Sequence, residues 1–84
     1  MSYIVYILKS DRDGSLYVGQ TCDLTRRLFQ HNDVSGTGFT SSLGPWEVIY
    51  TETHRTRSDA VRRERYLKSP DGSQDRKWLA ESSA

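Results

Sequence analysis

The stretch from residue 16 to residue 31 constrains the fold of this chain more than any other. It begins with Tyr17 and Val18, an aromatic and a β-branched residue, and with Gly19, which ends the strand that they predict. Small and capping side chains at residues 21–23 then predict the start of a helix. We therefore expect the rest of the chain to fold around a strand that turns directly into a helix.

The predicted helix carries an arginine and a histidine on the face that should turn inward. Four side chains fall at i, i+3, i+4 and i+7 on this face, namely Leu24, Arg27, Leu28 and His31. The two leucines mark the face as buried, whereas Arg26 lies on the opposite face. A half-buried arginine needs a partner. Two interpretations of Arg27 stay open: an ion pair with a carboxylate inside the fold, or a site that binds an anion.

The length of 84 residues suits one small domain over residues 1–84. We place its core at about residues 2–69 and expect a short C-terminal helix or tail over residues 70–84. No apolar run reaches membrane-spanning length and no signal-peptide pattern is present, so we expect a soluble, cytoplasmic protein. The single cysteine excludes an internal disulfide and a zinc site built from several cysteines.

The charges are unevenly distributed, although the net charge is only +1. Residues 54–68 contain six Lys or Arg and two acids, whereas residues 32–53 contain three acids and no Lys or Arg. This asymmetry predicts a basic face and a polyanionic partner, with a merely solvated face as the alternative. The basic residues that we assign to nucleic-acid binding are Arg26, Arg63 and Lys68.

The first residues predict a hairpin. Residues 3–8 are apolar and rich in β-branched and aromatic side chains, which predicts a strand buried on both faces and central in its sheet. Turn residues at 11–15 join it to the strand at 16–19. Tyr6 and Tyr17 lie on these two strands, and the default interpretation of each is a core residue whose hydroxyl finds one partner.

The second half predicts a loop, a strand and a helix. Residues 32–45 are rich in Gly and Ser and predict an irregular loop, which in so small a domain is usually functional or mobile. Residues 46–52 predict a third strand, whose place in the sheet stays open. A helix over about residues 58–68 should follow, capped by Thr56 or Ser58.

The C-terminal half also holds side chains whose surroundings can be predicted. We expect His54 in a polar loop, exposed to solvent. The tail from residue 73 is expected to be a short helix at most, in which Trp78 and Leu79 pack inward and residues 81–84 fray.

Glu64 is the second charged residue on an otherwise apolar face. It shares one side of the predicted helix with Ala60 and Leu67, at i, i+4 and i+7. The structural interpretation is that Glu64 pairs with Arg27 and has no other role.

These side chains together are compatible with phosphodiester hydrolysis. The lone acid argues against a glycosidase carboxylate pair and against a two-metal site. One Mg²⁺ held by one carboxylate, waters and the substrate phosphate is an arrangement that this ion accepts. Arg27 would then hold the phosphate, and a Tyr, a His or a metal-bound water would activate the attacking water. A tyrosine in that role should have a pKa lowered by the neighbouring positive charges.

At these residues the chain resembles the GIY-YIG nucleases, a family that includes homing endonucleases, restriction enzymes and the incision subunit of bacterial nucleotide excision repair. The residues that carry the resemblance are Val5-Tyr6-Ile7, Tyr17-Val18-Gly19, Arg27, His31 and Glu64. The similarity extends to about Ser69 and is greatest to the short stand-alone bacterial members. Its most specific part is the spacing from Tyr17 to Arg27 to His31.

The resemblance implies an α+β fold with a small three-stranded antiparallel sheet flanked by helices. It implies an endonuclease that hydrolyses DNA and depends on Mg²⁺ or Mn²⁺, with Glu64 as the only protein ligand of the metal and Arg27 on the scissile phosphate. One of Tyr6 and Tyr17 would place or deprotonate the attacking water. His31 matches a helix position that supports the site.

The chain departs from the family pattern at three places, two of which bear on substrate binding. Ile4 replaces the glycine of the first motif, as is usual in short members. Residues 40–44 carry no basic side chain, and residues 69–77 lack a dense basic run, so we expect weaker and less salt-sensitive DNA binding. Without a recognition domain, strong sequence specificity would need a partner protein. The alternative function is a nucleic-acid-binding or adaptor module whose nuclease site is idle or depends on a partner.

Overall fold

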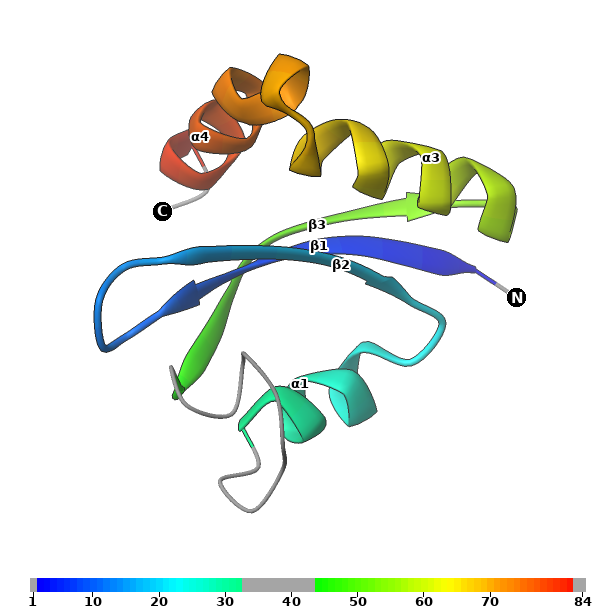
Figure 1. Ribbon diagram of the computed structural model, residues 1–84. Helices are drawn as coiled ribbons and strands as arrows, with labels where there is room; N and C mark the ends of the chain where they lie inside the picture. The colour runs from blue at the N-terminus through cyan, green and yellow to red at the C-terminus, as the bar shows by residue number, and fades with distance from the viewer. Residues whose placement is uncertain (1, 33–43, 83–84) are drawn as a thin grey trace.

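The computed structural model describes residues 2–32 and 44–82, which form three strands, three α-helices and one 3₁₀ turn (Figure 1). The strands are β1 (Tyr3–Ser10), β2 (Leu16–Thr21) and β3 (Trp46–His54). The helices are α1 (Leu24–Asn32), α3 (Arg57–Lys68) and α4 (Ser73–Ser82), and the 3₁₀ turn η1 (Pro70–Gly72) joins the last two. Residues 33–43, which hold most of the predicted loop, lie outside the described residues, as do residues 83–84 of the predicted frayed end.

The three strands form one antiparallel sheet in the order β2-β1-β3. This confirms the predicted α+β fold with a three-stranded sheet and places β3 beside β1, on the side away from β2. The strand β1 is central and buried on both faces, as its apolar run predicts. Val5, Tyr6, Ile7 and Leu8 are each 1% exposed or less.

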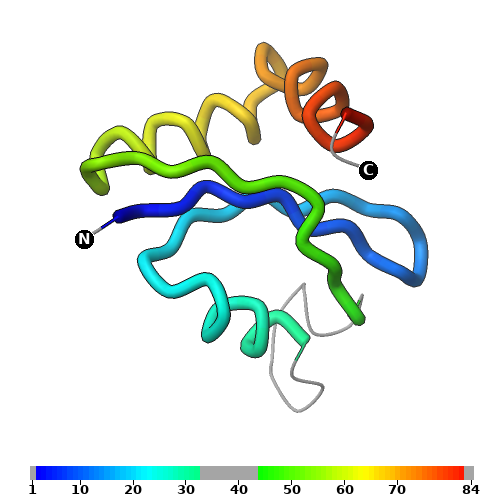
Figure 2. Tube along the Cα trace, turned by 180° about the vertical axis from the view of Figure 1, so that it is seen from behind, coloured from blue at the N-terminus to red at the C-terminus, as the bar shows by residue number. Residues whose placement is uncertain are grey.

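The central strand divides the core into two halves. Val5 and Ile7 pack with Leu67 of α3, while Tyr6 and Leu8 pack on the opposite face of the sheet, toward α1. Alternate residues of a strand point to opposite faces, so both halves draw on the same run of sequence. Figures 1 and 2 show the helices that cover the two faces of the sheet, from opposite sides. Helices α3 and α4 lie over one face and α1 lies over the other.

The hairpin between β1 and β2 forms as predicted and sets their register. The backbone N–H of Ser10 donates to the carbonyl of Ser15 at 2.8 Å, and Gly14 adopts a positive φ of 79° in the turn. Counting inward from this turn, Tyr6 of β1 lies directly opposite Gly19 of β2.

Helix α1 packs on the sheet through its leucines, but Arg27 is not on its buried face. Asp23 caps the helix and accepts a hydrogen bond from a backbone N–H of the first turn at 3.2 Å. Leu24 and Leu28 are half-buried and His31 is buried, whereas Arg27 is exposed. At about 100° per residue, Arg27 points about 60–70° away from the centre of the stripe that these three residues form. The prediction that Arg27 turns inward is therefore wrong, and its side chain borders the buried stripe.

The strand β3 is longer than predicted and includes His54. It begins after Pro45, where the backbone N–H of Trp46 donates to the side-chain oxygen of Asn32, the last residue of α1, at 2.6 Å. It ends at His54, two residues beyond the predicted end at Glu52. The prediction of an exposed loop position for His54 is wrong. His54 is the last residue of β3, and its half-buried ring contacts the Glu52 carboxylate on the same face of the strand.

Helix α3 forms as its cap and periodicity predict. The Thr56 side chain accepts a hydrogen bond from the backbone N–H of Asp59 at 3.1 Å. Ala60 and Leu67 are fully buried, and Glu64 lies beside them, half-buried. The predicted combination of a carboxylate and an apolar stripe is therefore present on this helix.

Helix α4, of ten residues, forms where the short C-terminal helix is predicted, but it continues to Ser82, past the predicted start of fraying at residue 81. Leu79 packs against the core as expected, but Trp78 is 65% exposed, so its predicted inward packing is wrong. Neighbouring residues of a helix point about 100° apart, and here Leu79 faces the core while Trp78 faces solvent. Among the helices of the described residues, none has both the length and the apolar character that crossing a membrane requires.

Candidate active site

Tyr6 and His31 form a buried polar pair between the sheet and α1. The Tyr6 Oη lies 2.9 Å from the His31 Nε2, and the two rings meet edge to face with 5.9 Å between centroids. The two residues are 1% and 7% exposed. The fold thus brings together two of the predicted site residues, which are 25 positions apart in the sequence.

Gly19 makes room for the Tyr6 hydroxyl. A Cβ at position 19 would lie 2.5 Å from the Tyr6 Cζ and closer still to its hydroxyl oxygen. Only glycine therefore lets the Tyr6 ring lie across β2 and reach His31. The sequence pattern predicts Gly19 as the end of a strand and as part of the Tyr17-Val18-Gly19 motif, but β2 continues to Thr21, and the contact of Gly19 with Tyr6 is not predicted. Its role follows from the hairpin register, which pairs Tyr6 with Gly19 and could be counted from the turn.

Tyr17 adds a third ring to those of Tyr6 and His31, and with Trp46 these residues form the aromatic cluster. The Tyr17 ring meets that of His31 edge to face, with 4.8 Å between centroids, and that of Trp46 at 6.2 Å. Tyr17 is half-buried and hence more accessible than Tyr6. Trp46 is not among the predicted site residues, and the sequence signal for it is its position at the start of a strand, directly after Pro45.

Burial and the charge of Arg27 control the ionisation of the Tyr6–His31 pair. Burial raises the pKa of Tyr6 well above its ordinary value; the Arg27 charge opposes this, while Tyr17 and Glu64 reinforce it. Burial also lowers the pKa of His31, with the Arg27 charge as the second cause. Both groups are therefore neutral near pH 7. The expected lowering of a tyrosine pKa does not hold for Tyr6, because burial outweighs the one nearby guanidinium.

Glu64 of α3 pairs with Lys68 one turn further along the helix. The Lys68 Nζ lies 2.9 Å from the Glu64 Oε2, and it also lies 5.2 Å from the centroid of the Tyr17 ring. These contacts join the edge of α3 to the aromatic cluster on the other face of the sheet. The partner of Glu64 is thus Lys68 and not Arg27, which contradicts the structural interpretation of Glu64 as the partner of Arg27.

The donor set at Glu64 suits a hydrated magnesium ion. Among the described residues, no three His, Cys, Asp or Glu side chains gather closely enough to hold a metal by themselves. Mg²⁺ usually keeps several waters and binds through one or two carboxylates and the substrate phosphates. The 20% exposed Glu64 side chain, beside the aromatic cluster, fits that mode of binding.

Arg26 and Arg27 both line a shallow depression between the turn after β2 and helix α1, together with Thr21, Cys22, Asp23 and Gln30. Both arginines are exposed, so the predicted contrast between an inward Arg27 and an outward Arg26 is smaller than expected. A larger cleft lies elsewhere, between the hairpin, β3 and the end of α4, and none of the predicted site residues lines it.

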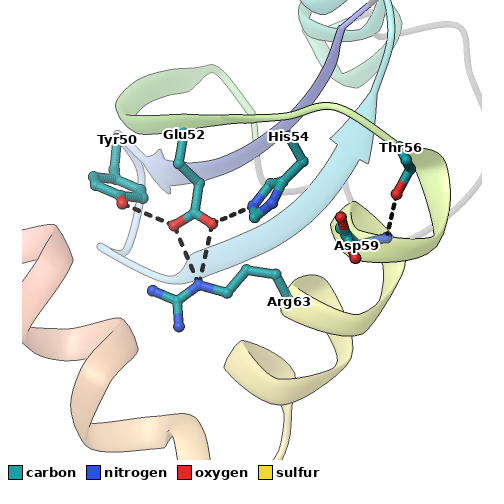
Figure 3. A network of polar contacts seen from close by, with 6 residues as sticks. All are labelled: Tyr50, Glu52, His54, Thr56, Asp59 and Arg63. Carbon is teal, nitrogen blue, oxygen red and sulfur yellow. Dashed lines mark hydrogen bonds and ion pairs between the residues drawn. The ribbon is translucent and has the colours of Figure 1, made fainter.

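Arg63 lies on the other side of α3 and takes part in a separate network (Figure 3). Its Nε donates to both oxygens of Glu52, at 3.2 and 3.1 Å, and Glu52 also accepts the Tyr50 hydroxyl at 2.8 Å and contacts the His54 ring. Burial raises the pKa of Glu52, but these hydrogen bonds and the Arg63 charge bring it below its ordinary value. The network ties α3 to β3, the strand at the opposite edge of the sheet from β2.

Comparisons with known proteins identify the family of this chain. The model of the GIY-YIG catalytic domain family matches residues 2–77. The UPF0213 protein SERP0126 of Staphylococcus epidermidis is 38% identical over 79 residues, which cover 94% of this chain and 95% of the relative. The UPF0213 protein SSP2268 of Staphylococcus saprophyticus is 36% identical over 67 residues, or 80% of each chain.

A solved structure has the same fold. The solution NMR structure of the UPF0213 protein BH0048 from Bacillus halodurans matches with a TM-score of 0.56 and 32% identity, over 94% of this chain and 85% of that one. The family match covers every residue that carries the resemblance, from Val5 to Glu64. The chain therefore belongs to the GIY-YIG domain family.

Proposed function

We propose that this protein is an endonuclease that hydrolyses phosphodiester bonds in DNA with one Mg²⁺ or Mn²⁺ ion. The observation that carries the proposal is the buried hydrogen bond between Tyr6 and His31, with the charges of Arg27 and Glu64 close enough to influence it. A neutral phenol–imidazole pair beside a guanidinium and a carboxylate is a costly arrangement for a small core. It is a useful one for moving a proton next to a phosphate.

The Tyr6–His31 pair supports a proton relay that leaves Tyr6 neutral and places the positive charge on His31. With the His31 proton on Nδ1, the neutral Nε2 can accept the Tyr6 hydroxyl proton. Tyr6 Oη would take up a proton from the attacking water as it passes its own to His31. Tyr17, more exposed and packed on His31, would shape the approach to this pair.

Arg27 is suited to bind the scissile phosphate because it is exposed. Its guanidinium lies beside the buried stripe of α1 and influences the pKa of both Tyr6 and His31. A phosphate that arrives from solvent can accept two parallel hydrogen bonds from such a group, which would stabilise the charge that develops in the transition state.

Glu64, whose charge acts on Tyr6, would hold the metal ion. When bound, Mg²⁺ supplies positive charge to a phosphate oxygen and to the leaving oxygen. Arg26, which lines the same depression of α1 as Arg27, and Lys68 of α3, whose side chain is half exposed, would contact neighbouring phosphates. Arg63 would do so only if DNA also crosses the β3 side of α3, where its Nε is engaged by Glu52.

The alternative is a nucleic-acid-binding module whose cleavage depends on a partner. The pairing of Glu64 with Lys68 favours it, because in this chain alone the carboxylate is already neutralised. The direct test incubates the purified chain with labelled single-stranded, duplex and forked DNA, with and without Mg²⁺. Cleavage only in the presence of Mg²⁺ is the expected result. DNA binding with no cleavage in Mg²⁺ or Mn²⁺ would reject the nuclease and support the module.

A further inference from the structure

Lys68 occupies the point where the candidate metal ligand meets the aromatic cluster. Its ammonium lies 2.9 Å from the Glu64 Oε2 and 5.2 Å from the Tyr17 ring centroid. The Lys68 side chain is 46% exposed, while that of Glu64 is only 20% exposed. Lys68 therefore occupies a carboxylate oxygen that a metal ion on Glu64 would need.

An ammonium and a divalent cation cannot share this carboxylate at close range. Mg²⁺ binds carboxylate oxygens at about 2.0–2.1 Å and brings its own shell of waters. If the Lys68 Nζ stayed at its present distance from the Glu64 Oε2, its positive charge would contact the water shell of the metal ion and repel the ion. Exposed pairs at i, i+4 are weak, so the ion can displace the lysine.

The displaced ammonium has a second attractive surface close by. The Tyr17 ring lies within reach of its Nζ, and a cation over an aromatic ring is stabilised by the ring's electrons. A substrate phosphate held at Arg27 and at the metal would bring negative charge to the same place. Moving from the carboxylate to a phosphate would let Lys68 keep a partner at every stage.

We propose, on the basis of the nuclease function above, that Lys68 is a latch that holds Glu64 in the free protein and transfers to a DNA phosphate when the metal binds. The latch weakens metal binding in the absence of DNA and couples the binding of the two. Lys68 is in this sense a positioning residue. Removing its charge should strengthen one kind of binding and weaken the other, which a loss of folding would not do.

The first measurement is the affinity for Mn²⁺ without DNA, followed by electron paramagnetic resonance. Lys68→Met keeps most of the side-chain stem and removes the charge, while Arg65→Met removes one charge from an exposed position of the same helix. Lys68→Met is expected to bind Mn²⁺ about three- to tenfold more tightly than Arg65→Met, because the substitution removes a positive charge that contacts the Glu64 carboxylate. Equal affinities, or weaker binding by Lys68→Met, would overturn the latch.

The second measurement is the gain in DNA affinity on adding Ca²⁺, by fluorescence anisotropy. Reciprocal coupling requires this gain to be about threefold or more smaller in Lys68→Met than in the wild type. An equal gain would overturn the proposed transfer.

Glu64→Gln separates the latch from the nuclease proposal. If it binds Mn²⁺ as the wild type does, the metal is not held at Glu64 and both proposals fail. If it loses Mn²⁺ while Lys68→Met and Arg65→Met are alike, only the latch fails.

Discussion

Replacing Gly19 by Ala tests how the candidate active site is built. The new Cβ would lie 2.5 Å from the Tyr6 Cζ, far inside the contact distance of two carbon atoms, so the ring must move. Tyr6 is 1% exposed and has no free space into which to move. Overpacking of this kind costs about 1–3 kcal/mol, and losing the hydrogen bond to His31 adds about 1 kcal/mol. We therefore expect Gly19→Ala to lose about 2–4 kcal/mol of unfolding free energy.

Thermal and urea denaturation would measure this loss. In a domain of this size each kcal/mol lowers Tm by about 4–8 °C, so the variant should melt roughly 8–32 °C lower. The control repeats Gly19→Ala in a Tyr6→Leu background, where no ring lies over position 19, and the cost there should fall below about 1 kcal/mol. A Gly19→Ala protein as stable as the wild type, or equal costs in both backgrounds, would refute the placement of the Tyr6 hydroxyl over Gly19.

Three further substitutions test single side chains. Arg27→Lys should lower the single-turnover cleavage rate at least about tenfold, because an ammonium cannot form the guanidinium fork, whereas Arg26→Lys should cost about twofold or less; equal losses would contradict the role of Arg27. Tyr6→Phe should lower the rate about a hundredfold and the urea-unfolding free energy by about 1 kcal/mol, and an unchanged rate would remove Tyr6 from the proton path. Glu52→Gln should flatten the acid-side fall in stability. Folding lowers the pKa of Glu52, so the stability that this carboxylate contributes is present above its ordinary pKa of 4.5 and is lost as the pH falls. Urea unfolding from pH 6 to about pH 3 measures this loss in the wild type and in Glu52→Gln. Matching stability profiles of the two proteins would contradict the network.

The elements of the fold could be predicted because each has a local cause. Four consecutive apolar residues around Tyr6 can only be buried on both faces of a sheet, and they belong to the central strand. Gly14 in the turn and Thr56 before α3 are chemical signals that act within a few residues of where they stand. The order of the strands could not be predicted in the same way, because it depends on contacts between β3 and β1, which are far apart in the sequence.

The details of the candidate site depend on side-chain directions that periodicity gives only coarsely. Arg27 lies at the margin of the buried stripe of α1, and a shift of about 60° decides whether it faces the core or the solvent. Glu64 takes Lys68 as its partner because the two are one turn apart on the same helix, whereas Arg27 would have to reach it from another element. The raised pKa of Tyr6 reflects total burial, which only the packed structure reveals.

The central claim is that Glu64 and the Tyr6–His31 pair belong to one hydrolytic site. Its most direct test is the single-turnover rate of DNA cleavage by Glu64→Gln, at saturating DNA and Mg²⁺, beside the wild type. Because the substitution keeps the shape of the side chain and removes the charge that would hold the metal, we expect a loss of at least about a hundredfold. DNA affinity and Tm should change little. Wild-type cleavage by Glu64→Gln would contradict the account.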